Sequence, residues 1–338
     1  MPEFVGGERL DTDIQAVDIP TRDLRIAAIV PCHNEAIAIE QVVMDLRTAV
    51  PGIGVYVYDN NSTDGTDEIA RAAGAIVRYE HAKGKGNVVR RAFADVEADV
   101  YLMIDGDGTY DASAAPDLIA TLMGGPYDHV LGVRQQISES AYRPGHETGN
   151  RLFNLVVGRI FAVEVSDMLS GYRVFSRRFV KSFPAVSREF ETETELTIHA
   201  ATLRVPQTEV AVGFTDRPEG GESKLRTYHD GFKILRLILH LTRYERPVLF
   251  HSLIAGALAL LGIGLGIPIV LEFLRTQTVP RFPTAILASA IEILAFMTFF
   301  LGQTLGALKR TKDENMRLVY LSMPPPNAVG AASTPNAR

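Results

Sequence analysis

DVYLMIDGDGTYD, residues 99–111, decides the fold of this chain, because an apolar run ends there in a cluster of acids separated by glycines. Two other segments repeat the pattern of an apolar run followed by a polar loop: RIAAIVPCHNE (25–35) and GVYVYDNNSTDGT (54–66). Short apolar runs bounded by turn residues predict buried strands. Helical patterns over 35–50, 67–74 and 84–96 separate these strands from one another and from a further strand at 75–80. This alternation predicts an α/β domain with a mostly parallel sheet and helices on both faces.

The polar loops that follow the strands are the candidate binding site. In open parallel sheets, ligands bind beyond the carboxyl ends of the strands, and all three loops fall at such ends. Asp105 and Asp107, with one glycine between them, can converge on one hard cation, and the glycine lets a diphosphate approach the backbone. Such a pair is compatible with a divalent cation, Mg²⁺ or Mn²⁺, beside a diphosphate leaving group, although the triplet by itself favours a surface turn.

The middle of the chain is less regular. We expect a strand at 129–134, a helix at 149–161, a helix around 191–203 and a strand at 209–214, which together complete the sheet. The predicted domain organisation is a flexible arm at 1–24 and an α/β domain at 25–228. An interfacial helix (229–246), a membrane hairpin (247–310) and a tail at 311–338 that is disordered at its end complete it.

The C-terminal third carries a membrane signal. Residues 229–246 form an amphipathic basic pattern that suits a lipid headgroup layer, although a core-packing helix has the same pattern. Residues 248–271 contain no Asp, Glu, Lys or Arg, and 282–308 contain only Glu292, so both are long enough to span hydrocarbon. Basic residues outside the hairpin outnumber the two arginines between the spans, which predicts cytoplasmic flanks.

Charge and cysteine content exclude other classes. The formal net charge of −6 gives no electrostatic footprint for nucleic acid. The single cysteine, Cys32, cannot form an intramolecular disulfide. Residues 1–24 contain acids and no continuous apolar core, so they do not have the pattern of a secretory signal. We therefore expect the bulk of the chain to stay in the cytoplasm.

Five motifs in a fixed order resemble a known family. VPCHNE (30–35), DNNSTDGT (59–66), DGDGTYD (105–111), DMLSGYR (167–173) and RPEGGESKL (217–225) are similar to the inverting family 2 glycosyltransferases with a GT-A fold. Among these the chain looks most like the polyprenyl-phosphate glycosyltransferases related to dolichyl-phosphate mannose synthase, and the hairpin suits the bacterial branch that uses undecaprenyl phosphate. The resemblance covers about residues 25–245 and implies that residues 25–228 are a catalytic domain of GT-A (Rossmann-like) type.

The resemblance implies roles for individual residues. It implies nucleotide contacts from Pro31, His33, Glu35, Asp59, Asn60, Lys85 and Asp105. It implies metal contacts from Asp105, Asp107 and Thr109, and catalytic roles for Asp107, Asp167 and Arg173. It implies an acceptor-phosphate site made by Arg134, Arg151, Arg217, Ser223 and Lys224, since guanidinium forks suit phosphate oxygens.

Other interpretations of these residues stay open. Arg134 and Arg151 could be surface arginines, and Lys85 could solvate a helix start. His146 and His199 are expected to be structural. Glu193 and Glu195 fit a paired acid or a helix entry equally well.

The function that the resemblance implies is transfer of a sugar from a nucleotide-sugar, with UDP preferred, to a polyprenyl phosphate at the cytoplasmic face of the inner membrane. Both termini would be cytoplasmic, and the hairpin suggests a homo-oligomer, for which a tetramer is one form by analogy. The alternatives are a processive polysaccharide synthase, disfavoured because the chain has no tryptophan, and a non-catalytic membrane scaffold. The sequence does not identify the sugar.

Overall fold

The computed structural model of the protein describes residues 24–136, 158, 166–186, 192–215, 239 and 242–326. Its centre is a seven-stranded sheet with the order β3-β2-β1-β4-β6-β5-β7. The strands are β1 (Ile26–Cys32), β2 (Gly54–Asp59), β3 (Ile76–Tyr79), β4 (Val100–Met103), β5 (His129–Gln136), β6 (Arg173–Ser176) and β7 (Gln207–Phe214). β6 runs antiparallel to β4 and β5, and the other pairings are parallel. The prediction of a mostly parallel sheet is confirmed.

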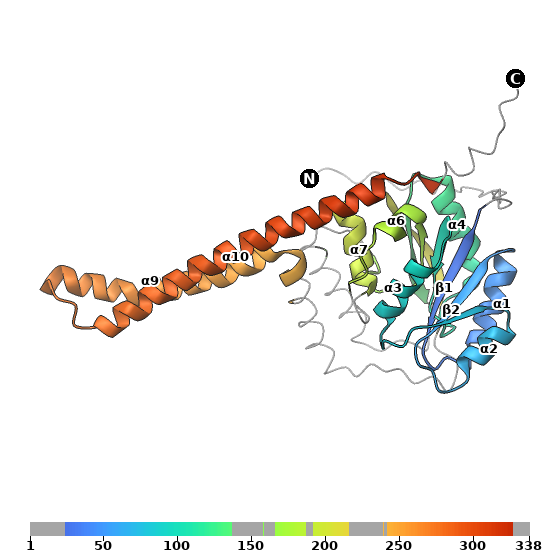
Figure 1. Ribbon diagram of the computed structural model, residues 1–338, viewed down its shortest axis with the longest axis horizontal. Helices are drawn as coiled ribbons and strands as arrows, with labels where there is room; N and C mark the ends of the chain where they lie inside the picture. The colour runs from blue at the N-terminus through green and yellow to red at the C-terminus, as the bar shows by residue number, and fades with distance from the viewer. Residues whose placement is uncertain are drawn as a thin grey trace, which may run out of the picture.

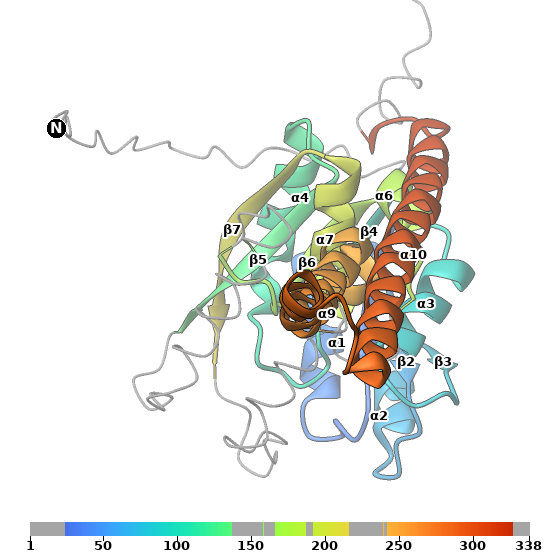
Figure 2. The ribbon, with the colours of Figure 1, turned by 90° about the vertical axis from the view of Figure 1, so that its left-hand side faces the viewer.

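Helices cover both faces of the sheet, as Figures 1 and 2 show. One face packs against α1 (Ile39–Ala49), α2 (Thr66–Ala72), the short η1 (Ala112–Ala114) and α4 (Ala115–Gly124). The other face packs against α3 (Lys85–Asp95), α6 (Arg177–Ser182) and α7 (Thr192–Leu203). In β1, Ala28 and Val30 face the first layer while Ala27 and Ile29 face the second, which is the two-residue period of a strand. Because both faces are covered, the central strands β1 and β4 are apolar and almost completely buried, as the sequence pattern predicts.

The first helix begins later than the sequence suggests. A helix from residue 35 was expected, but α1 begins at Ile39. The carbonyl of Glu35 accepts hydrogen bonds from the N–H groups of Ala38 (3.1 Å) and Ile39 (3.0 Å), so residues 35–38 form a turn before the helix starts. This turn keeps the polar loop after β1 at the edge of the sheet.

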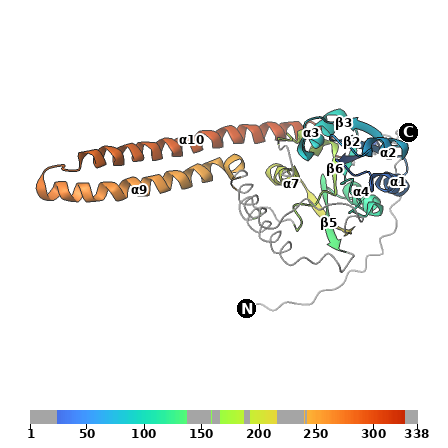
Figure 3. The same ribbon diagram turned by 90° about the horizontal axis from the view of Figure 1, so that it is seen from below.

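Two long helices project from the α/β domain as a hairpin: α9 (Pro247–Thr276) and α10 (Phe282–Leu321) (Figures 1 and 3). Both are long and apolar enough to cross a membrane. Their outward side chains are exposed, with Leu260 at 74% and Phe296 at 65%. An apolar surface of this extent needs a lipid or protein environment. α10 also continues well past residue 308, where the predicted span ends, and its last turns lie against the catalytic domain.

Several predicted segments lie outside the described residues. They are most of the N-terminal arm, the helix at 149–161 apart from Gly158, most of the interfacial helix at 229–246, and the end of the tail.

Candidate active site

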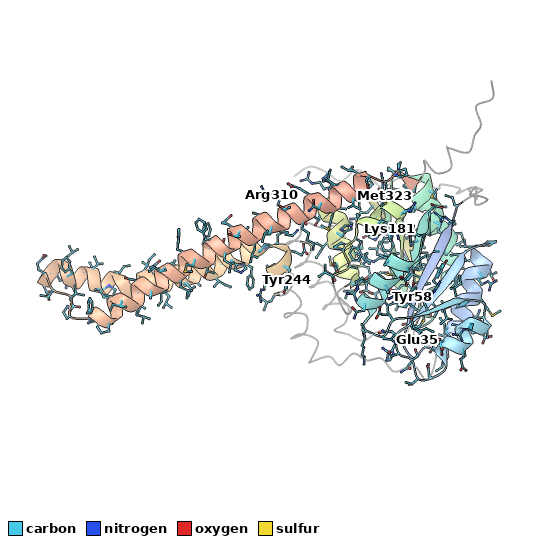
Figure 4. All side chains as sticks on the ribbon, viewed as in Figure 1. Glu35, Tyr58, Lys181, Tyr244, Arg310 and Met323 are labelled. Carbon is cyan, nitrogen blue, oxygen red and sulfur yellow. The ribbon has the colours of Figure 1, made fainter. Side chains whose placement is uncertain are left out.

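Hydrogen bonds join the first two polar loops at the carboxyl edge of the sheet. Asn34 accepts from the N–H of Thr63 (2.9 Å), and its own N–H donates to the Ser62 hydroxyl (3.0 Å). The N–H of Glu35 donates to the Thr66 hydroxyl (2.9 Å). Glu35 lies at the lower edge of the domain in Figure 4. The loops after β1 and β2 are thus held as one rigid wall.

Asp59 and His33 line this wall with unused polar atoms. Asp59 is 5% exposed; its Oδ1 accepts from the N–H of Ser62 (3.1 Å), while its buried Oδ2 has no hydrogen-bond partner among the described residues. The buried Nδ1 of His33 likewise has no hydrogen-bond partner among the described residues. Since buried polar atoms are normally satisfied, both atoms are candidates for contact with a ligand. Pro31 is the residue of β1 that pairs with Tyr58.

Asn60 has its amide fully engaged by the protein. Its Nδ2 donates to the carbonyls of Glu80 (2.6 Å) and Ala82 (2.9 Å), and its Oδ1 accepts from the N–H of Gly84 (2.8 Å). These bonds fix the loop that enters α3 and therefore place Lys85 at the first position of that helix. In this geometry Asn60 supports the site by position, and the nucleotide contact implied for it stays a prediction.

Lys85 joins two carboxylates. Its Nζ contacts Oδ1 of Asp105, and it lies 2.5 Å from Oε1 of Glu193 on α7. Burial alone would lower the pKa of Lys85, but the charges of Asp105 and Glu193 more than offset this and raise that pKa above its usual range. The side chain is therefore a fixed positive charge beside the predicted metal-binding acid.

Asp107 follows on the same loop and is oriented by Thr109. Oδ1 of Asp107 accepts from the Thr109 hydroxyl (2.7 Å) and from the Thr109 N–H (3.2 Å). Gly108 adopts a φ of +71°, a left-handed conformation that glycine takes without strain. The Thr109 hydroxyl thus directs its hydrogen at Asp107, and its role as a metal ligand stays a prediction.

The donor set fits a cation that arrives with a substrate. Within the residues described, no group of three or more His, Cys, Asp or Glu side chains is arranged to hold a metal ion. Mg²⁺ is commonly bound through one or two carboxylates plus substrate phosphates and water. Asp105 and Asp107 supply two carboxylates, and Lys85 already neutralises one of them. A diphosphate would complete the coordination.

The loop of residues 167–172 closes the site behind Asp105. The N–H of Gly171 donates to the Tyr110 hydroxyl (2.9 Å). A Cβ on Gly171 would come within 2.5 Å of Oδ2 of Asp105. Burial raises the pKa of Tyr110 to about 12, so its hydroxyl stays protonated at neutral pH. Glycine is therefore required at residue 171 for the carboxylate of Asp105 to take its position.

Arg134 and Asp167 form a bidentate ion pair. Nε of Arg134 lies 2.6 Å from Oδ2 of Asp167, and Nη2 lies 2.7 Å from Oδ1. The guanidinium also lies over the ring of Phe214, 5.3 Å from its centroid. Burial lowers the pKa of Arg134, but the hydrogen bond and charge of Asp167 reverse the shift and raise that pKa above its usual range. The structure thus brings together two residues that the sequence assigned separately to acceptor binding and catalysis.

Arg173 is completely buried. Its guanidinium donates to the carbonyls of Ser170 (2.8 Å) and Met168 (2.7 Å) and to the Thr197 hydroxyl (2.9 Å). Burial lowers its pKa to about 10, against the opposing charges of Glu193 and Asp167. With no exposed surface, Arg173 holds the 167–172 loop against α7, so in this structure its contribution is one of position.

Four predicted acceptor residues, Arg151, Arg217, Ser223 and Lys224, lie outside the described residues, as does His146. His199 is buried beside Phe179 and Phe183, which fits its predicted structural role. Glu193, by contrast, lies in the site although the sequence left its role open. It is 4% exposed, and its Oε2 has no hydrogen-bond partner in the described part of the chain. The segment FETETEL also fits the start of an ordinary helix, so the sequence alone does not assign Glu193 to the site.

Known proteins resemble this chain in sequence. The model of the family described as Glycosyl transferase family 2 matches residues 27–183. Glycosyltransferase AglJ of Haloferax volcanii is 34% identical over 261 residues, covering 75% of this chain and 84% of that protein. The dolichyl-phosphate hexose transferase of the same organism is 27% identical over 221 residues, covering 65% of this chain and 95% of that protein.

Solved structures share the fold. A crystal structure of glucosyl-3-phosphoglycerate synthase from Mycobacterium tuberculosis, in complex with Mn²⁺, uridine-diphosphate-glucose and glycerol 3-phosphate, superposes with a TM-score of 0.52. It is 22% identical in sequence, and the match covers 66% of this chain and 80% of that one.

Proposed function

Since the chain belongs to glycosyl transferase family 2, we propose that it moves a hexose, with inversion, from a UDP-linked donor to a polyprenyl phosphate held in a membrane. The observation that carries the proposal is the convergence of Asp105, Asp107, Lys85 and the Arg134–Asp167 pair at one edge of the sheet. That edge combines acids for a cation and diphosphate with a guanidinium for a second phosphate.

The donor would bind along the wall formed by the first two loops. The unpartnered atoms of Asp59 and His33 suit the base and ribose of a nucleotide. The uridine-diphosphate-glucose bound by the Mycobacterium tuberculosis synthase supports a UDP-linked donor. Lys85 would stabilise the diphosphate electrostatically as negative charge develops on it.

Asp105 and Asp107 would hold a divalent cation together with the donor diphosphate, and that cation would neutralise charge on the leaving group. The Mn²⁺ and Mg²⁺ complexes of the structural neighbours support this assignment. The Thr109 hydroxyl keeps the carboxylate of Asp107 in position, and the absence of a side chain at Gly171 leaves room for that of Asp105.

Arg134 would bind the acceptor phosphate, and Asp167 would orient the guanidinium of Arg134. A polyprenyl phosphate is ionised near neutral pH, so its oxygen can attack the anomeric carbon without a strong base. Because both oxygens of Asp167 are held by the guanidinium of Arg134, we assign Asp167 to orienting that group. Proximity and charge stabilisation would then supply most of the rate. Arg151, Arg217, Ser223 and Lys224 would complete the phosphate site.

The hairpin would hold the enzyme at its lipid acceptor. The apolar helices α9 and α10 support membrane association, and the dolichyl-phosphate hexose transferase relative supports a polyprenyl-phosphate acceptor. The distribution of basic residues favours the cytoplasmic face with both termini cytoplasmic. Association of hairpins into a homo-oligomer is part of the same proposal.

The test is transfer of radiolabelled hexose from UDP-hexose into an organic-extractable lipid by membranes that contain the protein and undecaprenyl phosphate. We expect Mg²⁺- or Mn²⁺-dependent labelling by the wild type and none by Asp107→Asn. Asp117→Asn is the matched control, because Asp117 is an exposed acid on α4 outside the site. Near-normal labelling by Asp107→Asn would remove the metal assignment, and labelling of no lipid with any UDP-hexose or GDP-hexose would remove the proposed reaction.

A further inference from the structure

α10 is longer than a bilayer requires. Its 40 residues extend about 60 Å at the rise of an α-helix. The hydrocarbon core of a bilayer is about 30 Å thick. The apolar part of α10 ends at Leu308, and Lys309, Arg310 and Lys312 follow. We call residues 309–321 the strut, because this part of the helix runs beyond the apolar span and along the catalytic domain (Figure 3).

The far end of the strut is hydrogen-bonded to a buried carboxylate of the domain. The hydroxyl of Tyr320 donates to Oδ2 of Asp128 (2.6 Å), across 192 positions of sequence. Asp128 is completely buried and also accepts from the Ser176 hydroxyl (2.6 Å) and from two nitrogens of Arg178 (both 2.5 Å). The guanidinium of Arg178 lies over the ring of Tyr320, 4.6 Å from its centroid. Hydrogen bonds to an ionised group are among the strongest that a protein makes.

The near end of the strut forms an ion pair with the segment that precedes α9. Nζ of Lys309 lies 3.2 Å from Glu245, which precedes α9, and 2.6 Å from Asp313. Between the two ends, Met316 packs against the core beneath α6 and α7. Lys309 and Tyr320 are separated by about 17 Å along the helix. The strut thus contacts the domain through Met316 and Tyr320, about one helical turn apart, while the Lys309–Glu245 pair ties its start to the segment before α9.

The fastening reaches the strands that carry the acceptor-side residues. Asp128 immediately precedes β5, whose other end carries Arg134, and Ser176 ends β6, which begins with Arg173. Met323, just past α10, lies at the upper edge of the domain in Figure 4, and Glu35 of the active-site edge lies at the lower edge. The strut therefore holds the sheet at the end remote from the site, where it sets the direction in which the site faces.

We propose that Tyr320 and Asp128 are positioning residues that lock the catalytic domain to α10, so that the active site is kept at a fixed height and angle relative to the membrane-spanning hairpin. This inference rests on the proposed function in one respect, namely that the acceptor is held in the membrane. The lock serves only an acceptor that cannot diffuse to the site. A short, water-soluble prenyl phosphate reaches the site in any orientation of the domain.

The experiment uses the full-length protein in vesicles of phosphatidylethanolamine and phosphatidylglycerol. Tyr320→Ala removes both the hydroxyl and the ring over Arg178, and Tyr320→Phe restores the ring. Leu321→Ala is the matched control, since Leu321 is 64% exposed on the same turn. For undecaprenyl phosphate in the vesicle we expect kcat/KM to fall about tenfold in Tyr320→Ala, the equivalent of one hydrogen bond to a charged group, and less in Tyr320→Phe. For soluble citronellyl phosphate we expect all variants to stay within about twofold of the wild type.

A distance measurement separates the lock from the reaction. Spin labels at Asp117→Cys on α4 and Asn315→Cys on the strut lie at exposed positions, while the natural Cys32 is buried. We expect one narrow distance distribution in the wild-type background and a broad one with Tyr320→Ala. A narrow distribution in Tyr320→Ala, or equal losses with both acceptors, would overturn the proposal. If the wild type transfers no sugar to either acceptor, the proposed function fails, while the label distances still decide whether the lock exists.

Discussion

Replacing Arg134 should lower the stability of the protein, because its ion pair with Asp167 would be broken. The Asp167 side chain is 8% exposed and that of Arg134 is 27% exposed. Arg134→Ala would remove both guanidinium hydrogen bonds from a nearly buried carboxylate and leave it only the longer bond from the backbone N–H of residue 134 (3.4 Å). The guanidinium contact with the ring of Phe214 would also be lost.

The expected loss of stability follows from the burial of the pair. Breaking a fully buried ion pair by removing one partner costs about 3–5 kcal/mol. Because Arg134 retains some contact with solvent, we discount this to about 2–3 kcal/mol. For a domain of this size that corresponds to a fall of about 4–12 °C in the thermal midpoint.

The assay is thermal unfolding of the detergent-solubilised protein, followed by transfer activity. Arg134→Met combined with Asp167→Leu should recover most of the lost midpoint, because it removes both charges together. It should not recover transfer, which needs the orienting pair. Arg91→Ala, which breaks the exposed helix pair with Asp95, should leave the midpoint unchanged. If Arg134→Ala unfolds at the wild-type temperature, or if the double variant is no more stable than Arg134→Ala, the pair has been misinterpreted.

Three further outcomes follow from the same geometry. Gly171→Ala should reduce transfer by about a hundredfold in the radiolabel assay while the protein stays folded, because the added Cβ would displace the Asp105 carboxylate. Lys85→Met should lower the free energy of unfolding by about 3 kcal/mol and weaken UDP-hexose binding in calorimetry, because Lys85 neutralises two carboxylates. Burial lowers the pKa of both His129 and His199 to about 3, so below about pH 6.5 the folded protein binds fewer protons than the unfolded chain. The stability from these neutral histidines is complete above pH 6.5 and is lost as the pH falls toward 3; at about pH 5 the loss is about 2 kcal/mol for each, measured by thermal unfolding against pH.

Each of these outcomes has a result that would contradict it. Full activity in Gly171→Ala would mean that the 167–172 loop does not hold Asp105 in place. Unchanged donor affinity in Lys85→Met would separate Lys85 from the diphosphate. A His129→Gln/His199→Gln variant whose midpoint falls as steeply with acid as the wild type would show that other groups carry the pH dependence.

The strands and their loops were predictable because their signals are local. The apolar runs of β1 and β4 are buried on both faces of the sheet, and the polar loops follow strand ends, so the sequence alone assigns Asp59, Asp105 and Asp107 to one edge. The apolar spans were predictable for the same reason, since length and composition alone identify them.

The remaining features depend on partners that are distant in sequence. The antiparallel direction of β6 is set by its pairing with β4 and β5, and nothing in RVFS specifies that. The contact of Glu193 with Lys85 joins α7 to α3, and no periodicity in the sequence predicts it. The continuation of α10 to a carboxylate in front of β5 is equally non-local, so a span prediction that ended at residue 308 had no reason to extend it.

The fastening of Tyr320 to Asp128 makes the two halves of this enzyme interdependent as building blocks. A chimera that joins this catalytic domain to the hairpin of another protein would keep an intact fold and an intact anchor, yet would lack the matching tyrosine. Exchange of such parts, in the laboratory or in evolution, would succeed only when both sides of the contact are exchanged together.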